Sequence, residues 1–251
     1  MAGPSRIALY RLLLLVFLIA LWWVISLHVR ANFIPSPWAT ALAAHRLLVE
    51  GKLIVALGES LVTFLGGYGL GIAVAIPLGL MMGVFVPVGK TLEVYVYALA
   101  AMPRVAFIPL IIVFLGLGFP AKISIVFLGA VMPVLINTYA GVLAVDPELI
   151  EMARSVRARR LDVFKRIVLP SAVPFIIVGL RLGATIALIN TVVAELYTAV
   201  RGLGGLLAIY GNSFRMAEYF VIVIVLAIIG VLVSEGLRHL EKHLARWKTS
   251  A

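Results

Sequence analysis

The sequence places three ionisable side chains inside long apolar stretches: Arg104, Arg181 and Glu195. A charge at the centre of a bilayer costs at least about 2.5–3.5 kcal/mol, so such a residue usually faces the interior of a helix bundle or a water-filled path. An arginine keeps its proton, and its charge must therefore find an anion, a carboxylate or water. We expect Arg104 either to line a pathway that favours anionic or carbonyl-rich solutes or to have a structural role.

The other two charges have several partners within reach. Arg181 could pair with Glu195, with Glu93 or with backbone carbonyls. We expect Glu195 to be structural and to hold the outer end of the pathway against Arg201. The candidate pathway residues are Arg104, Asn137, Asn190 and Glu195.

The chain offers no convergent set of catalytic groups. It contains no cysteine, which excludes thiolate metal sites and thiol nucleophiles. His239 and His243 share a helix face, but Leu240 stands where a zinc protease needs glutamate. Residues 84–91 come close to a nucleotide-binding loop, yet they begin with valine and follow a lipid-length helix instead of a strand. We therefore expect no enzymatic activity, no metal and no cofactor, so that any ATP hydrolysis belongs to another polypeptide.

The stretches that hold these residues indicate the class of protein. Apolar residues make up 63% of the chain and charged residues 13%, against roughly 45–50% and 25% in a soluble domain. The excess apolar surface must face lipid. Six stretches are long enough, or nearly so, to cross a bilayer as helices of about 20 residues, which predicts an all-α membrane protein. They are Ile7–Val29, Ser60–Gly89, Val94–Leu117, Ile123–Val145, Val173–Glu195 and Tyr219–Leu237.

The basic residues are distributed unevenly around these stretches. With the N-terminus in the cytoplasm, most of the 21 lysines and arginines fall on the inner side, as the positive-inside rule requires. Both termini are then cytoplasmic. The net charge of +10 belongs to this pattern, and we expect no nucleic-acid partner.

The same assignment divides the chain into three parts. Residues 1–59 form an N-terminal transmembrane helix and a periplasmic connection, and residues 60–240 form the core. The core contains a polar cytoplasmic loop at 146–169, and residues 241–251 form a cytoplasmic tail. Pro103 lacks an N–H and is expected to kink the third membrane helix beside Arg104.

The cytoplasmic loop carries the most specific pattern. It reads Glu151-Met152-Ala153-Arg154-Ser155-Val156-Arg157, and after residues 158–166 it continues Ile167-Val168-Leu169-Pro170. This resembles the EAA motif of binding-protein-dependent ABC permeases, in which Glu-Ala-Ala, a glycine and Ile-x-Leu-Pro recur at the same spacing. Met152 replaces the first alanine and Arg157 replaces the glycine. The residues that the resemblance implies for ATPase coupling are Glu151, Met152, Ala153, Ser155, Arg157, Ile167, Leu169 and Pro170.

The motif has a physical rationale. Asp146-Pro147-Glu148 is a helix start with proline at the first helical position. A short amphipathic helix can insert into a cleft of a soluble partner, and small residues such as Ala153 and Ser155 allow close approach. A glycine after that helix permits a left-handed turn. An arginine at this position either pays about 1–2 kcal/mol for the same geometry or makes a different turn.

Several further stretches are similar to the branch of this family that carries nitrate, sulfonates and taurine, and that also holds permeases for pyrimidine precursors of thiamine. They lie in or beside the third to sixth membrane helices. The stretches are Pro103–Leu110, Phe114–Gly118, Asn137–Val142, Gly179–Leu182, Val192–Glu195 and Gly202–Leu206.

The resemblance implies a type I ABC importer permease fold in a bacterial inner membrane. It implies a homodimer that surrounds one pathway, two cytoplasmic ATPase subunits, a periplasmic or lipid-anchored substrate-binding protein and alternating access. The expected solute is small and anionic, like a sulfonate, nitrate or taurine; a thiamine pyrimidine precursor or another small organic solute is the alternative. A self-contained secondary transporter would explain the membrane helices and buried charges, but not the spacing of the loop motif.

Overall fold

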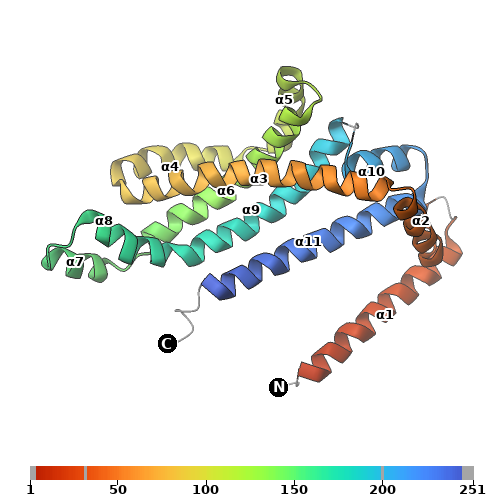
Figure 1. Ribbon diagram of the computed structural model, residues 1–251, viewed down its shortest axis with the longest axis horizontal. Helices are drawn as coiled ribbons and strands as arrows, with labels where there is room; N and C mark the ends of the chain where they lie inside the picture. The colour runs from red at the N-terminus through yellow and green to blue at the C-terminus, as the bar shows by residue number, and fades with distance from the viewer. Residues whose placement is uncertain (1–3, 31–32, 199–200, 245–251) are drawn as a thin grey trace.

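The computed structural model describes residues 4–30, 33–198 and 201–244, and within them the side chains of all but residues 4, 5, 8 and 240–244. The described residues form helices joined by short turns (Figure 1). The helices are α1 Pro4–His28, α2 Pro37–Val49, α3 Lys52–Val84, α4 Val86–Ala101, α5 Ile108–Leu115, α6 Phe119–Leu143, α7 Pro147–Ser155, α8 Arg160–Val163, α9 Leu169–Thr198, α10 Leu203–Asn212 and α11 Met216–Leu244.

The predicted membrane helices are confirmed, with one broken in two. Within the described residues, α1, α3, α6, α9 and α11 contain stretches long and apolar enough to cross a membrane, and α4 together with residues 104–115 makes a sixth. This broken span, the third along the chain, bends by 83° at Met102–Pro103. Met102 has an extended backbone (φ −71°, ψ 141°), because a residue before proline is pushed out of the helical region. The kink expected at Pro103 is therefore a full break, followed by a short 3-10 turn, Arg104–Phe107.

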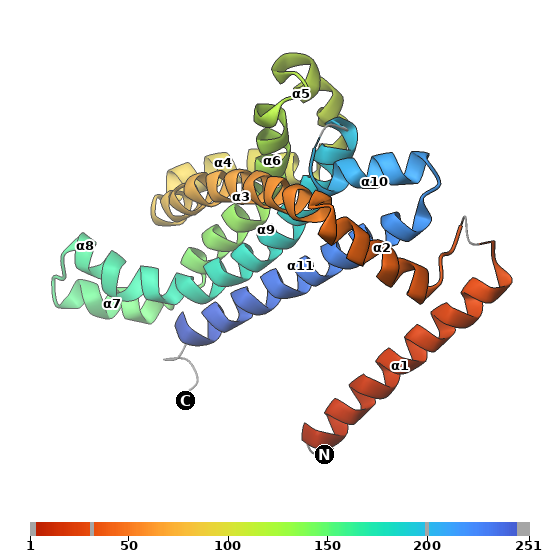
Figure 2. The same cartoon turned by 45° about the vertical axis from the view of Figure 1, so that its right-hand side comes forward.

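The centre of the fold is formed by α3, α6 and α9, which lie side by side in both ribbon views (Figures 1 and 2). Glycines allow the backbones to approach closely, as is common between membrane helices. A Cβ on Gly67 of α3 would lie 2.5 Å from Val126 Cβ of α6, and one on Gly179 of α9 would lie 2.8 Å from Asn137 Cβ of α6. These positions hold glycine because no larger residue fits between the helices.

The first helix stands apart from this centre (Figure 2). Its membrane-spanning stretch is apolar and none of it is buried within the chain. Contacts at its C-terminal end hold it: Trp22 Nε1 donates to Pro35 O at 2.9 Å, and the Trp22 ring stacks on Phe220 with centroids 5.8 Å apart. The apolar surface of α1 must therefore face lipid or another subunit.

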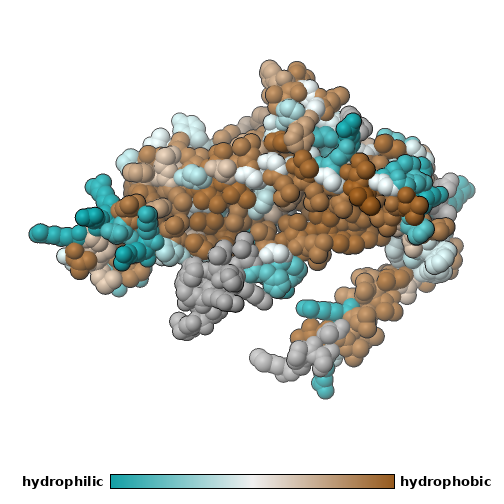
Figure 3. Space-filling model, viewed as in Figure 1, coloured by the Kyte–Doolittle hydropathy of each residue, from teal (hydrophilic) through white to brown (hydrophobic). Residues whose placement is uncertain are grey.

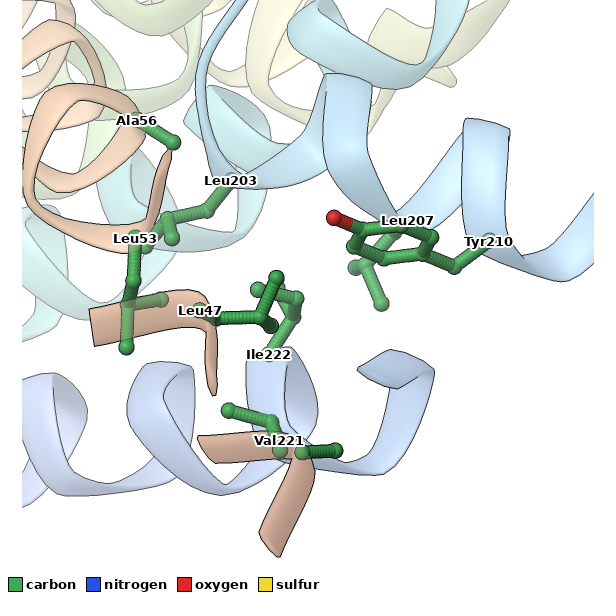
Figure 4. Close-up of a cluster of buried hydrophobic side chains, with 9 residues drawn as sticks. Leu47, Leu53, Ala56, Leu203, Leu207, Tyr210, Val221 and Ile222 are labelled. Atoms are coloured by element: carbon green, nitrogen blue, oxygen red, sulfur yellow. The ribbon is translucent and has the colours of Figure 1, made fainter. Parts of the chain in front are cut away.

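A separate apolar cluster joins α2 and α10 to the adjoining ends of α3 and α11 (Figure 4). Leu47, Leu203 and Ile222 are fully buried there. An ionic contact lies at the edge of the cluster. Glu218 Oε1 accepts hydrogen bonds from Arg46 at 3.0 Å and from Arg215 at 2.6 Å. The connection expected at residues 31–59 therefore contains a packed helix, α2, and the first turns of α3.

The surface agrees with a membrane location. In Figure 3, apolar side chains cover the flank of the helix bundle, and hydrophilic side chains gather on α7 and α8 at one end and around α2 and α10 at the other. An apolar belt between two polar ends is the arrangement that a bilayer requires.

Candidate functional site

The helix expected in the cytoplasmic loop is present as α7. Asp146 lies immediately before it and accepts a hydrogen bond from the Glu148 N–H at 2.9 Å, so it caps the N-terminus as its position predicted. Glu151 and Met152 are exposed, and the Met152 side chain is 59% accessible. Ala153 on the opposite side is buried. The helix therefore presents an exposed face beyond the membrane helices.

The turn after α7 adopts left-handed geometry at Arg157, with φ +54°. The Ala158 N–H donates to Ala153 O and the Arg157 N–H donates to Arg154 O, both at 2.9 Å. These two bonds define a Schellman motif, in which the left-handed residue is usually glycine. Of the two alternatives for Arg157, the structure has the first: the chain keeps the left-handed turn, although this geometry is unfavourable for an arginine.

The rest of the loop returns to the membrane through α8 and a single π-helical turn, Phe164–Val168. Ile167, Leu169 and Pro170 are half-buried in this segment. A hollow of about 270 Å³ lies between the turn after α7 and this segment, lined by Ala153, Ala158 and Ile167 among others. The structure therefore brings together both halves of the sequence motif at one end of the molecule.

Arg104 lies on the 3-10 turn that follows the break in the third span. Its Nη1 donates to Gly129 O at 3.3 Å and its Nη2 donates to Ala100 O at 3.4 Å. The side chain is half-buried beside a cavity of about 170 Å³ that Met132 also lines. Arg104 thus has backbone carbonyls as partners, and a pathway role stays a prediction.

The two asparagines differ in their surroundings. Asn137 donates to Pro133 O of its own helix at 2.8 Å, with Gly179 packed against its Cβ. Asn190 is buried on α9 against Gly129: a Cβ built there would lie 1.8 Å from the asparagine Nδ2. Because Gly129 O also accepts from Arg104, the structure brings Arg104 and Asn190 to one residue of α6.

Glu195 is fully buried near the end of α9. Its carboxylate accepts hydrogen bonds from Ser60 Oγ at 2.8 Å and from the Gly204 N–H at 2.9 Å. Gly204 is in the first turn of α10, where unpaired backbone N–H groups favour an anion. A Cβ on Gly202 would lie 2.2 Å from Glu195 Oε1, so only glycine fits above the carboxylate.

Three core helices hold the backbone of residues 201–204, which we call the outer turn. From α3, Glu59 accepts from the Gly202 N–H at 2.9 Å and Ser60 Oγ accepts from the Leu203 N–H at 2.8 Å. From α6, Lys122 donates to Arg201 O at 3.1 Å. Glu195 from α9 accepts from the fourth residue, so each of the four successive residues makes a backbone hydrogen bond to a side chain of a core helix. These bonds hold the start of α10 against α3, α6 and α9.

This arrangement corrects the expected partner of Arg201. Its guanidinium Nη1 lies 3.8 Å from Glu59 Oε1, whereas Glu195 is engaged by Ser60 and Gly204. Sequence reasoning also missed Lys122, which is only 7% exposed. Its position at the start of an apolar stretch, where a single lysine follows Gly118-Phe119-Pro120-Ala121, was the available signal.

The described residues of the weaker sequence patterns lie on helices or where two helices meet. Residues 84–91 lie where α3 ends and α4 begins, between two helices. His239 is exposed on α11, and the side chain of His243 lies outside the described residues, as do residues 245–251 of the expected tail. Among the side chains that the structure describes, no cluster of three or more histidine, aspartate or glutamate residues could hold a metal ion.

The structure is thus a bundle of helices of membrane-spanning length with an exposed helix projecting from one end. Residues 75–247 match the family described as binding-protein-dependent transport system inner membrane component. The chain belongs to this family, and is thus an ABC transporter permease of the inner membrane that crosses it several times.

Individual relatives agree with this assignment. The chain is 33% identical to SsuC of Bacillus subtilis (strain 168), named as an aliphatic sulfonates transport permease protein, over 95% of this chain and 87% of that protein. It is 29% identical to the taurine transport system permease protein TauC of Escherichia coli (strain K12), over 93% and 87%. A solved chain of the MetNI methionine ABC transporter superposes with a TM-score of 0.66 at 19% identity, over 79% of this chain and 96% of that one. The fold is that of type I ABC importer permeases.

Proposed function

We propose that this chain forms the transmembrane pathway of an ATP-driven importer for a small anionic solute of the sulfonate, nitrate or taurine kind. The observation that carries the proposal is α7, an exposed, capped helix followed by a left-handed turn at the spacing of the EAA motif. A secondary transporter has no need of such a helix. The names of the relatives SsuC and TauC support the solute class. A thiamine pyrimidine precursor is the alternative solute.

The partner subunits follow from the same helix. A cytoplasmic ATPase docks on α7, and the exposed side chains of Glu151 and Met152 form part of the contact. Each copy of the chain carries one such helix, and the importer contains two ATPases. Two copies of the chain therefore form a homodimer, and each copy binds one ATPase. A periplasmic or lipid-anchored binding protein delivers the solute at the other end. The chemistry of ATP hydrolysis belongs entirely to the ATPase.

The proposed mechanism is alternating access. Closure of the two ATPases draws the α7 helices together and opens the pathway outward, and hydrolysis resets it. The proposed orientation puts both termini and α7 in the cytoplasm, and residues 60–240 act as the moving core. Most of the basic residues then lie inside, in keeping with the positive-inside rule.

Uptake into proteoliposomes tests the proposal. The permease, its ATPase and its binding protein are reconstituted, and accumulation of radiolabelled taurine, an alkanesulfonate and nitrate is compared with ATP, without ATP and with an imposed proton gradient alone. We expect uptake of at least one of these solutes that requires ATP and the binding protein. Accumulation driven by the ion gradient without ATP would instead establish a secondary transporter and refute the proposal.

A further inference from the structure

A cavity of about 680 Å³ lies beside the outer turn, between one face of α3 and the segment that joins α5 to α6. This volume is in the range that holds a small organic ligand, roughly 300–1,000 Å³. Most of the lining is apolar, and the charged side chains come from different elements. The lining includes Ile54, Gly58, Glu59, Val62, Lys122 and Arg201.

The charges on this lining favour an anion. Lys122 is only 7% exposed, and its ammonium has three N–H donors, of which one reaches Arg201 O at 3.1 Å. The Arg201 side chain is 74% exposed, and its 3.8 Å separation from Glu59 is too long for a hydrogen bond. Glu59, the single carboxylate on the lining, already accepts from the Gly202 N–H. Two cations with spare donors therefore face one carboxylate across the lining, and the buried carboxylate of Glu195, outside the lining, interacts electrostatically with Lys122.

We propose that this cavity is a binding site for a small organic anion, with an oxyanion head group at Lys122 and Arg201 and a short apolar chain along α3. The apolar chain would lie against Ile54 and Val62, which flank Gly58 on the same face of the helix. The proposal deepens the proposed function, on which it rests, by assigning a solute contact within the permease. An anionic phospholipid has the same head-group chemistry, and the experiment separates the two sources.

Gly58 provides a way to close the cavity without disturbing the fold. A Cβ added at Gly58 meets no atom within 4 Å, so a larger side chain would extend into open space. Glycine in a helix interior is less favourable than most residues by about 0.5–1 kcal/mol, so Gly58→Leu should not weaken α3. Gly69, on the same helix and also free of contacts within 4 Å, does not line the cavity and supplies the matched control.

The test uses the purified permease–ATPase complex in phosphatidylcholine nanodiscs, without nucleotide or binding protein. Hexanesulfonate is the probe and hexan-1-ol is its neutral counterpart. A ligand that binds only the folded state stabilises it by RT ln(1 + [L]/Kd), so the dependence of Tm on ligand concentration gives Kd. We expect hexanesulfonate to raise Tm and hexan-1-ol to leave it unchanged. Arg201→Gln, at an exposed position, should weaken binding by about tenfold, because a charge-assisted hydrogen bond is lost.

Two leucine variants on α3 test whether hexanesulfonate binds in this cavity. Gly58→Leu should abolish the effect of hexanesulfonate, and Gly69→Leu should leave it intact. Equal effects of the anion and the alcohol, or wild-type binding by Gly58→Leu, would overturn the proposal. Loss of hexanesulfonate binding when phosphatidylglycerol is added to the nanodiscs would assign the cavity to a lipid head group and would also overturn it.

Three further outcomes distinguish this site from the proposed function and from a dimer interface. The chain has no cysteine, so Gly58→Cys carries its only thiol; a thiol that a maleimide cannot reach in the assembled dimer would show that a second copy covers the cavity, against the proposal. If the wild-type complex shows ATP-driven uptake but does not bind hexanesulfonate, the anion site in the cavity is refuted and the proposed importer function stands. If the complex binds hexanesulfonate but shows no ATP-driven uptake, the proposed importer function is refuted and the anion site stands.

Discussion

Arg157→Gly should remove the left-handed strain from the turn that follows α7. Arg157 has φ +54°, a geometry that costs a residue with a Cβ about 1–2 kcal/mol. Glycine avoids this cost but loses about 0.5–1 kcal/mol in backbone entropy on folding. Removal of the guanidinium also forfeits roughly 0.3–1 kcal/mol of interaction with the helix C-terminus. These contributions largely cancel, so the glycine variant should differ from the arginine wild type by no more than about 1 kcal/mol.

Arg157→Ala separates these effects, because it removes the charge and keeps the Cβ. The glycine variant should exceed the alanine variant by about 1 kcal/mol, a difference of roughly fivefold in the equilibrium constant for local opening. Hydrogen exchange at the Ala158 amide, which donates to Ala153 O, reports this opening directly. Rates are divided by those of unfolded peptides carrying the same substitutions. Equal protection in the glycine and alanine variants would refute the argument from left-handed geometry.

Four further outcomes are expected. Glu151→Arg should weaken ATPase binding or transport while the permease stays folded and inserted; unchanged ATP-dependent uptake would contradict a coupling role. Cysteines introduced at Arg159 and Pro37 should react with an impermeant maleimide from opposite sides of the membrane, and periplasmic labelling of both would overturn the proposed orientation. Arg104→Gln should abolish transport while assembly and basal ATPase persist; loss of the dimer would show a structural role, and unaltered transport would exclude the pathway role. Glu195→Leu should lower the Tm of the complex and its stability by about 1–3 kcal/mol, because the buried Ser60 hydroxyl and the Gly204 N–H lose their acceptor; an unchanged Tm would contradict the role of the carboxylate.

The order of the membrane helices was predictable because it depends on composition over long windows. Apolar stretches of about 20 residues are helical in a bilayer, where backbone groups have no other partner. The sharp bend at Met102–Pro103 was only partly foreseen. Pro103 indicated a kink, but the 83° angle arises where Met102 takes an extended backbone and a 3-10 turn follows.

The cytoplasmic loop was also predictable, because its features are local. Whether the turn at Arg157 is left-handed stayed open in the sequence, because an arginine stands at the usual glycine position. The Asp146 cap and the proline at the first helical position involve residues only a few positions apart. Such motifs depend on hydrogen bonds within one or two turns of chain, and residue types at fixed offsets predict them.

The sequence by itself determined that this is an all-α membrane protein with a short helix in its polar loop, because hydropathy and short-range motifs are properties of neighbouring residues. Only the tertiary structure decided the partners of the buried charges. Ser60 meets Glu195 across 135 positions, and Glu59 meets Gly202 across 143. Any carboxylate near the end of a membrane helix could have paired with Arg201, and the packing of α3, α6 and α9 selected Glu59. The same packing places Lys122 beside Arg201 and so creates the charged end of the cavity, because such contacts depend on how the helices are arranged in space.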